Sequence, residues 1–385
     1  MGKPLRNIRR DDEYAAALAE VLAVAKDRAV DAVLVAGDVF DTAVPTPDAE
    51  RVVFGFFGEL FAAGIPAVVI AGNHDHPRRW NAYAPVFRHL GIRVLGEPVS
   101  IEDGGVFELP SRDGKETAMI AALPWVSERK VRDFESLMQA GTHFGQYAEG
   151  VSAMIRHLCS AFRADTANVL LAHIFLNGAE VSAGSGERPL HIGDVYAVTP
   201  QSIPNTVQYA ALGHIHNPEQ PKSFELANAY YSGSLLRCDF GEEKHRKGVR
   251  LVEVSAGKKA RMEFIELAAP KHLRNLGTHK EGLTLDDLKA LADGASDAYL
   301  KVFLKADRPV PGLAEQVREI LPNAVDIVIQ RPDVVVDEKE RALDRMSPAE
   351  LFTAYYRGAH NDGTPDEKLM ALFNRLYEEA TSATD

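Results

Sequence analysis

The chain has 385 residues, more than one compact domain usually holds, and this length predicts two or three domains. Its composition is 46% hydrophobic and 25% charged, as in ordinary globular proteins. We expect neither a signal peptide nor a membrane span, because the first residues are charged and the longest apolar region is interrupted by glycine and proline. The two cysteines, Cys159 and Cys238, have no metal-binding spacing, so a disulfide framework is not expected and a reducing cytoplasm fits.

The net charge of −12 argues at first sight against a nucleic-acid partner. However, the last 53 positions hold 12 acidic and 6 basic residues, so half of the excess lies at one end of the chain. Basic clusters such as residues 6–10 are equally consistent with a solvated face and with a phosphate contact. Charge alone therefore leaves the partner open.

The first two-thirds of the chain alternate between helix-like and strand-like segments. Apolar spacing predicts helices at 14–25 and 47–63, and a stretch rich in glycine, serine and proline predicts a long surface loop at 184–204. Short apolar runs predict buried strands at 32–36, 67–71, 169–172 and 209–212. This alternation predicts an α/β layered fold, in which ligands bind beyond the carboxyl ends of the strands.

Two smaller units are predicted after the first. Strands at 299–306 and 324–330 on either side of a helix at 312–320 predict a small α+β module over residues 270–335. Beyond an acidic linker at 337–345, residues 340–385 predict a pair of helices.

Each helix of this pair has a predicted capping box, Ser347-Pro348-x-Glu350 in the first and Thr364-Pro365-x-Glu367 in the second. The helices carry apolar stripes formed by Leu351, Phe352, Tyr355 and Tyr356 and by Leu369, Leu372, Phe373, Leu376 and Tyr377. Two short helices cover only part of each other, so we expect exposed apolar surface that binds a partner.

Each predicted buried strand of the first unit is followed by side chains that can bind metals. A single motif of this kind is often only a turn or a core histidine, but four in succession at strand ends favour a metal site. Carboxylate, amide and imidazole ligands suit a divalent ion such as Mn²⁺, and a two-metal site needs a bridging carboxylate. Glycine before three of the motifs is expected to let the backbone turn sharply. The candidate residues are Asp38, Asn73, His74, Asp75, His173, His214 and His216.

These motifs resemble the calcineurin-like metallophosphoesterases. The segments VVIAGNHD at 68–75, YYSGSL at 230–235, DFGE at 239–242 and SPAELF at 347–352 further resemble the SbcD nuclease subunits of bacterial SbcCD complexes, over almost the whole chain. The resemblance implies a layered metallophosphoesterase β-sandwich flanked by helices over 1–269. A small α+β capping domain at 270–335 and a C-terminal helix pair would follow.

The resemblance also implies roles for the candidate residues. Asp38 would bridge two divalent ions, expected to be Mn²⁺. Asn73, His173 and His214 would complete one of the two sites, and His216 would serve the other.

Two further roles concern the chemistry itself. His74 would stabilise the transition state and protonate the leaving oxygen, with Asp75 holding its ring. The family opens with a strand that ends in Asp-x-His, two ligands of the ion that His216 serves. No such motif precedes Asp38, so the domain is expected to be N-terminally incomplete and that ion to lack ligands.

The implied function is that of a manganese-dependent exonuclease and endonuclease in DNA repair. It would process double-stranded DNA ends and hairpins with an SbcC-like SMC ATPase, as a homodimer within a heterotetramer. One alternative is a metallophosphoesterase that acts on small substrates, and another is a non-catalytic subunit that bridges DNA and the ATPase. Metal content and DNA cleavage by the purified protein distinguish the three.

Overall fold

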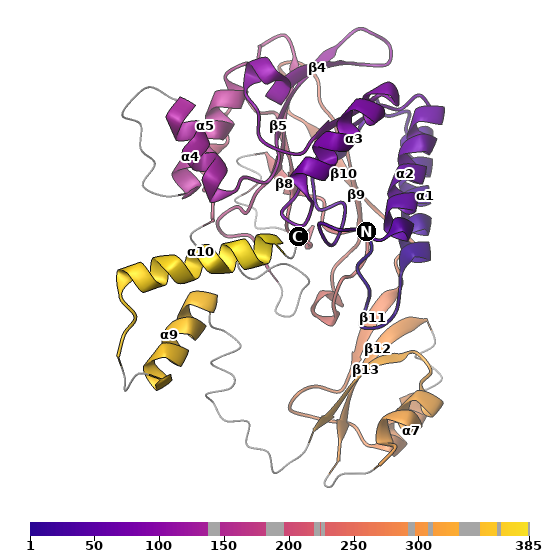
Figure 1. The fold of residues 1–385 in the computed structure, drawn as a ribbon. Coiled ribbons are helices and arrows are strands. Elements are labelled where there is room, and N and C mark those ends of the chain that lie inside the picture. Colours follow the sequence, from indigo (N-terminus) through magenta and orange to yellow (C-terminus); the bar gives the residue numbers. More distant parts are fainter. Residues whose placement is uncertain are drawn as a thin grey trace.

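A computed structural model of the protein describes residues 1–137, 147–181, 196–218, 224, 228–291, 297–306, 311–330, 347–359 and 363–383 (Figure 1). The predicted acidic linker at 337–345 lies outside the described residues, as does most of the predicted surface loop at 184–204.

Two sheets pack face to face in the first unit. One is parallel and consists of β1 (Val33–Val35), β2 (Ala67–Ile70) and β3 (Ile92–Leu95). The other has the order β4 (Val106–Pro110), β5 (Thr117–Leu123), β6 (Ala167–His173), β7 (Tyr209–Gly213) and β8 (Ala229–Tyr231), and only β4 runs antiparallel to its neighbour. Alternate residues of a strand face opposite sides. Val68 and Ile70 of β2 accordingly pack between the sheets against Ile120 and Leu171.

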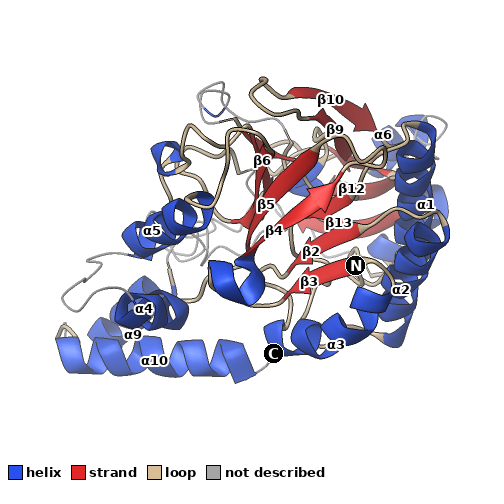
Figure 2. Cartoon of the chain, turned by 90° about the horizontal axis from the view of Figure 1, so that it is seen from above, coloured by secondary structure: helices blue, strands red, loops and turns tan. Residues whose placement is uncertain are grey.

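Helices cover the outer faces of both sheets, as Figure 2 shows from above. The other side chains of β2, Ala67 and Val69, pack against α1 (Asp11–Asp27), α2 (Pro47–Ala62) and α3 (Pro77–His89). The five-stranded sheet is covered by α4 (Glu128–Leu137) and α5 (Tyr147–Cys159). This arrangement confirms the predicted α/β sandwich flanked by helices. Among the described residues, no helix is long and apolar enough to cross a membrane.

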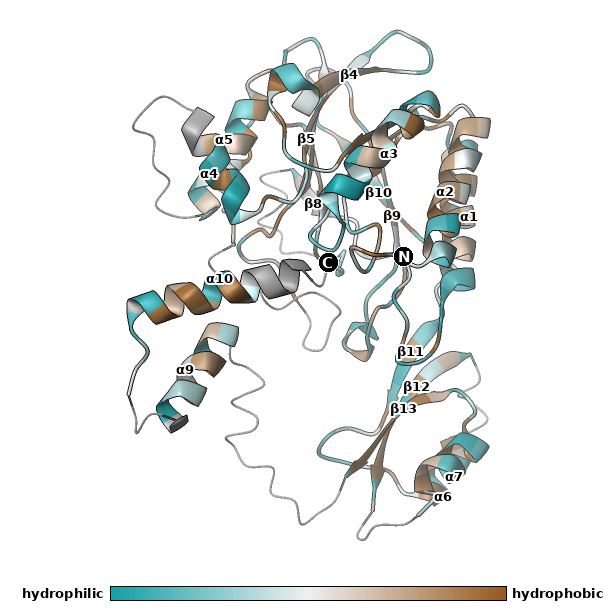
Figure 3. Ribbon diagram, in the orientation of Figure 1, coloured by the Kyte–Doolittle hydropathy of each residue, from teal (hydrophilic) through white to brown (hydrophobic). Residues whose placement is uncertain are grey.

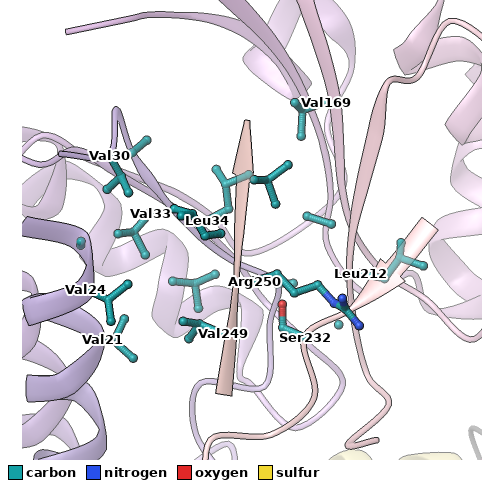
Figure 4. Close-up of a pocket in the computed structure, with 18 of the residues that line it drawn as sticks. Val21, Val24, Val30, Val33, Leu34, Val169, Leu212, Ser232, Val249 and Arg250 are labelled. Atoms are coloured by element: carbon teal, nitrogen blue, oxygen red, sulfur yellow. The ribbon is translucent and has the colours of Figure 1, made fainter. Parts of the chain in front are cut away.

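A cavity of about 970 Å³ separates β1 from the antiparallel hairpin of β9 (Gly248–Glu253) and β10 (Arg261–Glu266). Figure 4 shows its apolar walls, which include Leu34 of β1, Val249 of β9 and Val169 of β6. Both β1 and β9 end their sheets here. In the described part of the chain, neither strand has a backbone partner on the cavity side.

The unit predicted as a capping domain, which we call the second unit, has a parallel sheet of its own. It consists of β11 (His272–Leu276), β12 (Ala298–Lys305) and β13 (Ala324–Gln330), with α6 (Leu285–Leu291) and α7 (Leu313–Ile320) packed on it. The predicted strands at 299–306 and 324–330 and the helix between them are therefore present, whereas β11 was not predicted.

Arginines of the basic cluster at 6–10 connect the second unit to the first. Arg6 forms ion pairs of 3.1 Å with Asp239 and 2.7 Å with Asp326 of β13. Arg10 pairs with Glu13 at 2.8 Å, and Glu13 in turn accepts a 2.7 Å hydrogen bond from the Tyr299 hydroxyl. Arg6 and Arg10 of this cluster are thus engaged in ion pairs with carboxylates of the protein itself.

The C-terminal helices are α9 (Pro348–Ala359) and α10 (Glu367–Ala383). The capping box of α9 is confirmed: Glu350 N–H donates to Ser347 Oγ, and Ser347 N–H donates to the Glu350 carboxylate at 2.7 Å. The box predicted at Thr364 is wrong, because α10 begins two residues later than that box requires. Asp366 caps this helix by accepting a 2.8 Å hydrogen bond from Leu369 N–H, and its negative charge also suits a helix N-terminus.

Apolar side chains of the two helices meet only in part. Phe352 and Phe373 stack with ring centroids 4.2 Å apart. Figure 3 shows hydrophobic residues continuing along α10. The side chains that remain exposed are Leu351 at 38%, Tyr355 at 73%, Leu372 at 41% and Leu376 at 49%. These four residues form what we call the α9–α10 apolar surface, and their exposure confirms the expected partial coverage.

Candidate metal centre

Four of the predicted ligands come together where buried strands end. Asp38 follows β1, Asn73 follows β2, His173 ends β6 and His214 follows β7. Asn73 Oδ1 lies 3.0 Å from both His173 Nε2 and His214 Nδ1. Asp38 Oδ2 lies 3.3 Å from His173 Nε2. The structure therefore assembles a carboxylate, an amide oxygen and two imidazoles, all of them metal ligands, around one point.

The hydrogen bonds of His173 show that this cluster fits a cation. Its Nδ1 lies 2.6 Å from the carbonyl oxygen of Ala36, which can only accept, so Nδ1 carries the hydrogen. In the neutral ring, Nε2 then has only a lone pair, yet it faces the oxygens of Asn73 and Asp38. Two buried acceptors and the partly exposed carboxylate of Asp38 around one point need a positive charge between them. A backbone carbonyl on the remote nitrogen is also the usual partner of a metal-binding histidine.

Protonation of His173 can supply that charge when no metal does. Burial by itself disfavours a charged ring, but the carboxylate of Asp38 outweighs it and raises the pKa of His173. Conversely, the burial of Asp38 favours its neutral form, and the His173 ring reverses this and holds the pKa of Asp38 well below its ordinary value. Protons and divalent ions therefore compete for the same position.

Tightly placed backbone holds these ligands in position. Asp38 has a φ of 51° and Gly37 before it has a φ of 90°, a combination that L-residues adopt only at a cost. A Cβ on Gly37 would clash with the His173 ring and lie 2.9 Å from the backbone of Gly72. Cβ atoms on Gly72 and Gly213 would also collide with the site. The glycines before Asp38, Asn73 and His214 thus allow the close approach of the strand ends.

Asp75 has a different role from the predicted one. Its carboxylate accepts hydrogen bonds of 2.9–3.1 Å from the backbone N–H groups of Val39, Phe40 and Gly72, which fix the loops after β1 and β2. Asp75 was expected to hold the His74 ring, but the ring is held by Asp41 instead: His74 Nδ1 lies 2.8 Å from the carbonyl oxygen of Asp41. The N–H of His74 donates to Asp38 Oδ1 at 2.9 Å, so this residue borders the centre.

His216 belongs to a second, adjacent group of side chains. Its Nδ1 lies 2.8 Å from Glu242 Oε1, and ligand atoms of His216, Cys238 and Glu242 all lie within 4.8 Å of one another. Asp38, His74 and His214 line the same cavity as His216 and Cys238, so both groups border one space.

Three residues near the two groups were missed in the sequence. Cys238 precedes the DFGE segment and Glu242 ends it, and the resemblance of this segment predicted no role for either residue. Trp125 follows no metal-binding pattern, yet its ring stacks on His214 with a centroid distance of 5.4 Å and an interplanar angle of 21°. An aromatic wall of this kind limits the positions open to the His214 ring.

Comparisons with known proteins agree with this geometry. Residues 11–218 match the family described as calcineurin-like phosphoesterase, and residues 272–359 match the type 5 capsule protein repressor C-terminal domain. The chain is 30% identical to the SbcD subunit of the nuclease SbcCD from Bacillus subtilis strain 168, with 98% of this chain and 95% of that protein covered. Identity to the corresponding SbcCD nuclease subunit of Rhodobacter capsulatus is also 30%, with 92% of each chain covered. The chain therefore belongs to the calcineurin-like metallophosphoesterases and, within them, to the SbcD family of nuclease subunits.

Proposed function

We propose that this chain is a Mn²⁺-dependent DNA nuclease that hydrolyses phosphodiester bonds at a centre for two divalent ions. Its substrates would be double-stranded DNA ends and hairpins, and it would act with an SbcC-like SMC ATPase. The observation that carries the proposal is the convergence of His173 Nε2 with the oxygens of Asn73 and Asp38, at 3.0 and 3.3 Å, three groups that can bind one cation. Full-length similarity to SbcCD subunits supports the choice of substrate.

The ligands divide between two positions. Asn73, His173 and His214 would hold one ion, His216 would contribute to the other, and Asp38 would contact both. When bound, the ions offset the charge of the phosphodiester and activate water for attack. The hydrogen bond from His74 N–H to Asp38 Oδ1 fixes the orientation of the carboxylate that would contact both ions.

The contact of His74 with Asp41 defines how this ring could act as an acid. A carbonyl oxygen can only accept, so Nδ1 of His74 carries a hydrogen that donates to Asp41. In the neutral ring, Nε2 would then hold a lone pair. Proton donation to the leaving oxygen therefore requires the imidazolium form, with the transferred proton on Nε2.

The α9–α10 apolar surface would bind the ATPase. In the described part of the chain, no residue of α9 or α10 belongs to the buried cores. Tyr355 is 73% exposed, and Leu351, Leu372 and Leu376 are exposed as well, so large apolar side chains are available to a partner. The similar proteins are named as subunits of SbcCD, which supports a partner for this surface.

The test is to measure bound Mn²⁺ and cleavage with the purified chain. Linear duplex, hairpin-ended duplex, closed circular duplex and bis(p-nitrophenyl) phosphate serve as substrates, and Asp38→Asn is the inactive control. We expect Mn²⁺-dependent cleavage of the linear and hairpin DNA that the control lacks. Cleavage of the small ester alone would favour the small-substrate enzyme. DNA binding without cleavage of any substrate would favour the non-catalytic subunit.

A further inference from the structure

We infer that Glu242 is a positioning residue for His216, and that its buried carboxylate fixes the ring so that Nε2 binds the metal. This inference rests on the proposed two-ion function, because it concerns the centre that His216 serves. It assigns to Glu242, and to Lys247 beside it, a role in metal binding without direct coordination.

The contact between the two side chains determines which ring nitrogen carries the hydrogen. Glu242 is fully buried, and its Oε1 lies 2.8 Å from His216 Nδ1. An ionised carboxylate only accepts hydrogen bonds, so Nδ1 must be the donor. The lone pair of the neutral ring is then on Nε2, which becomes the metal-binding nitrogen. A carboxylate on the remote nitrogen also makes the ring a stronger ligand.

The surroundings of Glu242 keep it ionised. Its Oε2 lies 2.7 Å from the ammonium group of Lys247, whose side chain is 1% exposed. Oε2 also accepts a 3.0 Å hydrogen bond from the N–H of Cys238. The carboxylate therefore stays charged and keeps accepting from His216.

Lys247 anchors the backbone of His216 as well. Its Nζ donates to the carbonyl oxygen of His216 at 3.1 Å and to Ser234 Oγ at 2.7 Å. The ammonium group thus joins the loop after β7, the loop after β8 and the start of β9. Both the ring and the main chain of His216 are held by one buried ion pair.

Stability alone is a poor reason for this pair. Removing two charges from water costs several kcal/mol, and apolar residues of the same volume often replace a buried pair without loss. Direct coordination by Glu242 is also disfavoured, because Oε1 is bonded to His216 and Oε2 to Lys247 and Cys238. A positioning role explains why both charges are buried at this place.

The test compares Mn²⁺ binding to the full chain and to four variants, one of which is Cys238→Ser. Glu242→Gln removes the charged acceptor, and the double variant Glu242→Gln/Lys247→Met also removes the ammonium group that would otherwise lose its partner. Glu243→Gln is the matched control, since the neighbouring Glu243 bonds to Asn275 instead. Electron paramagnetic resonance counts weakly and tightly bound Mn²⁺, and circular dichroism checks folding.

We expect both Glu242 variants to bind the ion at the His216 centre about 10–100-fold more weakly, as is usual when a support of a metal-binding histidine is lost. The ion held by Asn73, His173 and His214 should keep its affinity, and Glu243→Gln should bind like the unmodified chain. In the Zn²⁺-loaded unmodified chain, ¹⁵N shifts should show His216 bound through Nε2 with hydrogen on Nδ1.

Coordination through Nδ1 would overturn the inference, even if neither Glu242 variant folds. So would unchanged affinity in a folded Glu242 variant, or an equal loss in Cys238→Ser, which would indicate direct ligation by the cluster. Failure of the proposed function is a separate result: the unmodified chain would then bind no second ion at all.

Discussion

Replacing Gly37 with alanine should remove metal from the first centre through a single added methyl group. Gly37 has a φ of 90°, and its missing Cβ leaves room for the His173 ring and for the backbone of Gly72. None of these neighbours is a flexible surface group. The ring is fully buried and bonded to Ala36, and the Gly72 backbone carries a hydrogen bond to Asp75.

The expected effect has two parts. A left-handed backbone with a side chain costs about 1–2 kcal/mol. The added Cβ would also lie 2.9 Å from Gly72 where ordinary contacts begin at 3.4 Å, so neighbouring groups must move by about half an ångström or more. A metal site tolerates ligand displacements of roughly 0.2 Å. We therefore expect at least a tenfold loss of Mn²⁺ affinity at this centre.

Gly64→Ala separates the two parts. Gly64 follows α2 with a φ of 66°, and its added Cβ would meet nothing within 4 Å. Thermal denaturation should show a modest loss of stability in Gly64→Ala and a larger one in Gly37→Ala, and only Gly37→Ala should lose Mn²⁺. Normal Mn²⁺ binding by Gly37→Ala, or equal destabilisation of the two variants, would refute the reasoning.

Three further predictions concern the acid, the C-terminal helices and pH. His74→Ala should lower turnover about 10²–10⁴-fold and leave the amount of bound Mn²⁺, measured by elemental analysis, nearly unchanged. Asp38→Ala should instead lose the metal. Metal loss in His74→Ala would contradict the role of His74 as an acid. Deletion of residues 340–385 should leave the melting temperature and DNA cleavage largely intact and should abolish co-purification with the ATPase. A large drop in melting temperature, with ATPase binding retained, would indicate that these helices have a structural role instead. In EDTA, protonated His173 and His216 stabilise the fold fully below their ordinary pKa of 6.5, and this stability is lost as the pH rises through their raised pKa values. The melting temperature should therefore fall over that range, whereas Mn²⁺ should bind more tightly there because it replaces the protons. A pH-independent Mn²⁺ affinity would rule this out.

The cluster of candidate ligands around Asp38 could be predicted because its signals are local. Apolar runs identify the buried strands, and a polar residue directly after each run has to lie at the sheet edge. Asp38 and Asn73 then follow neighbouring strands of one sheet, and His173 and His214 lie at the ends of neighbouring strands of the other. The face-to-face packing of the two sheets brings the four residues together. The capping box at Ser347 is equally local, since both of its partners lie within one turn of helix.

Contacts between distant segments could not be predicted in the same way. Glu242 meets His216 across 26 positions, and no periodicity connects the two. The DFGE segment that makes this contact carries part of the family resemblance, but nothing in its own residues points to His216. Asp75 was assigned to the adjacent His74 ring, but three backbone N–H groups offer its buried carboxylate a more complete set of donors.

The cavity between β1 and β9 leaves the facing edges of these two strands unpaired in the described part of the chain. Buried main-chain groups normally have partners, and an open strand edge is a template for pairing. An extended segment lying in this cavity could bond to both edges and would join the three-stranded and two-stranded sheets into one continuous sheet. Without such a segment, amide protons on the edge of β1 that faces the cavity should exchange with solvent faster than those of β2, which is hydrogen-bonded to strands on both sides. Hydrogen exchange at β1 would thus report directly on whether the gap beside the metal centre is filled.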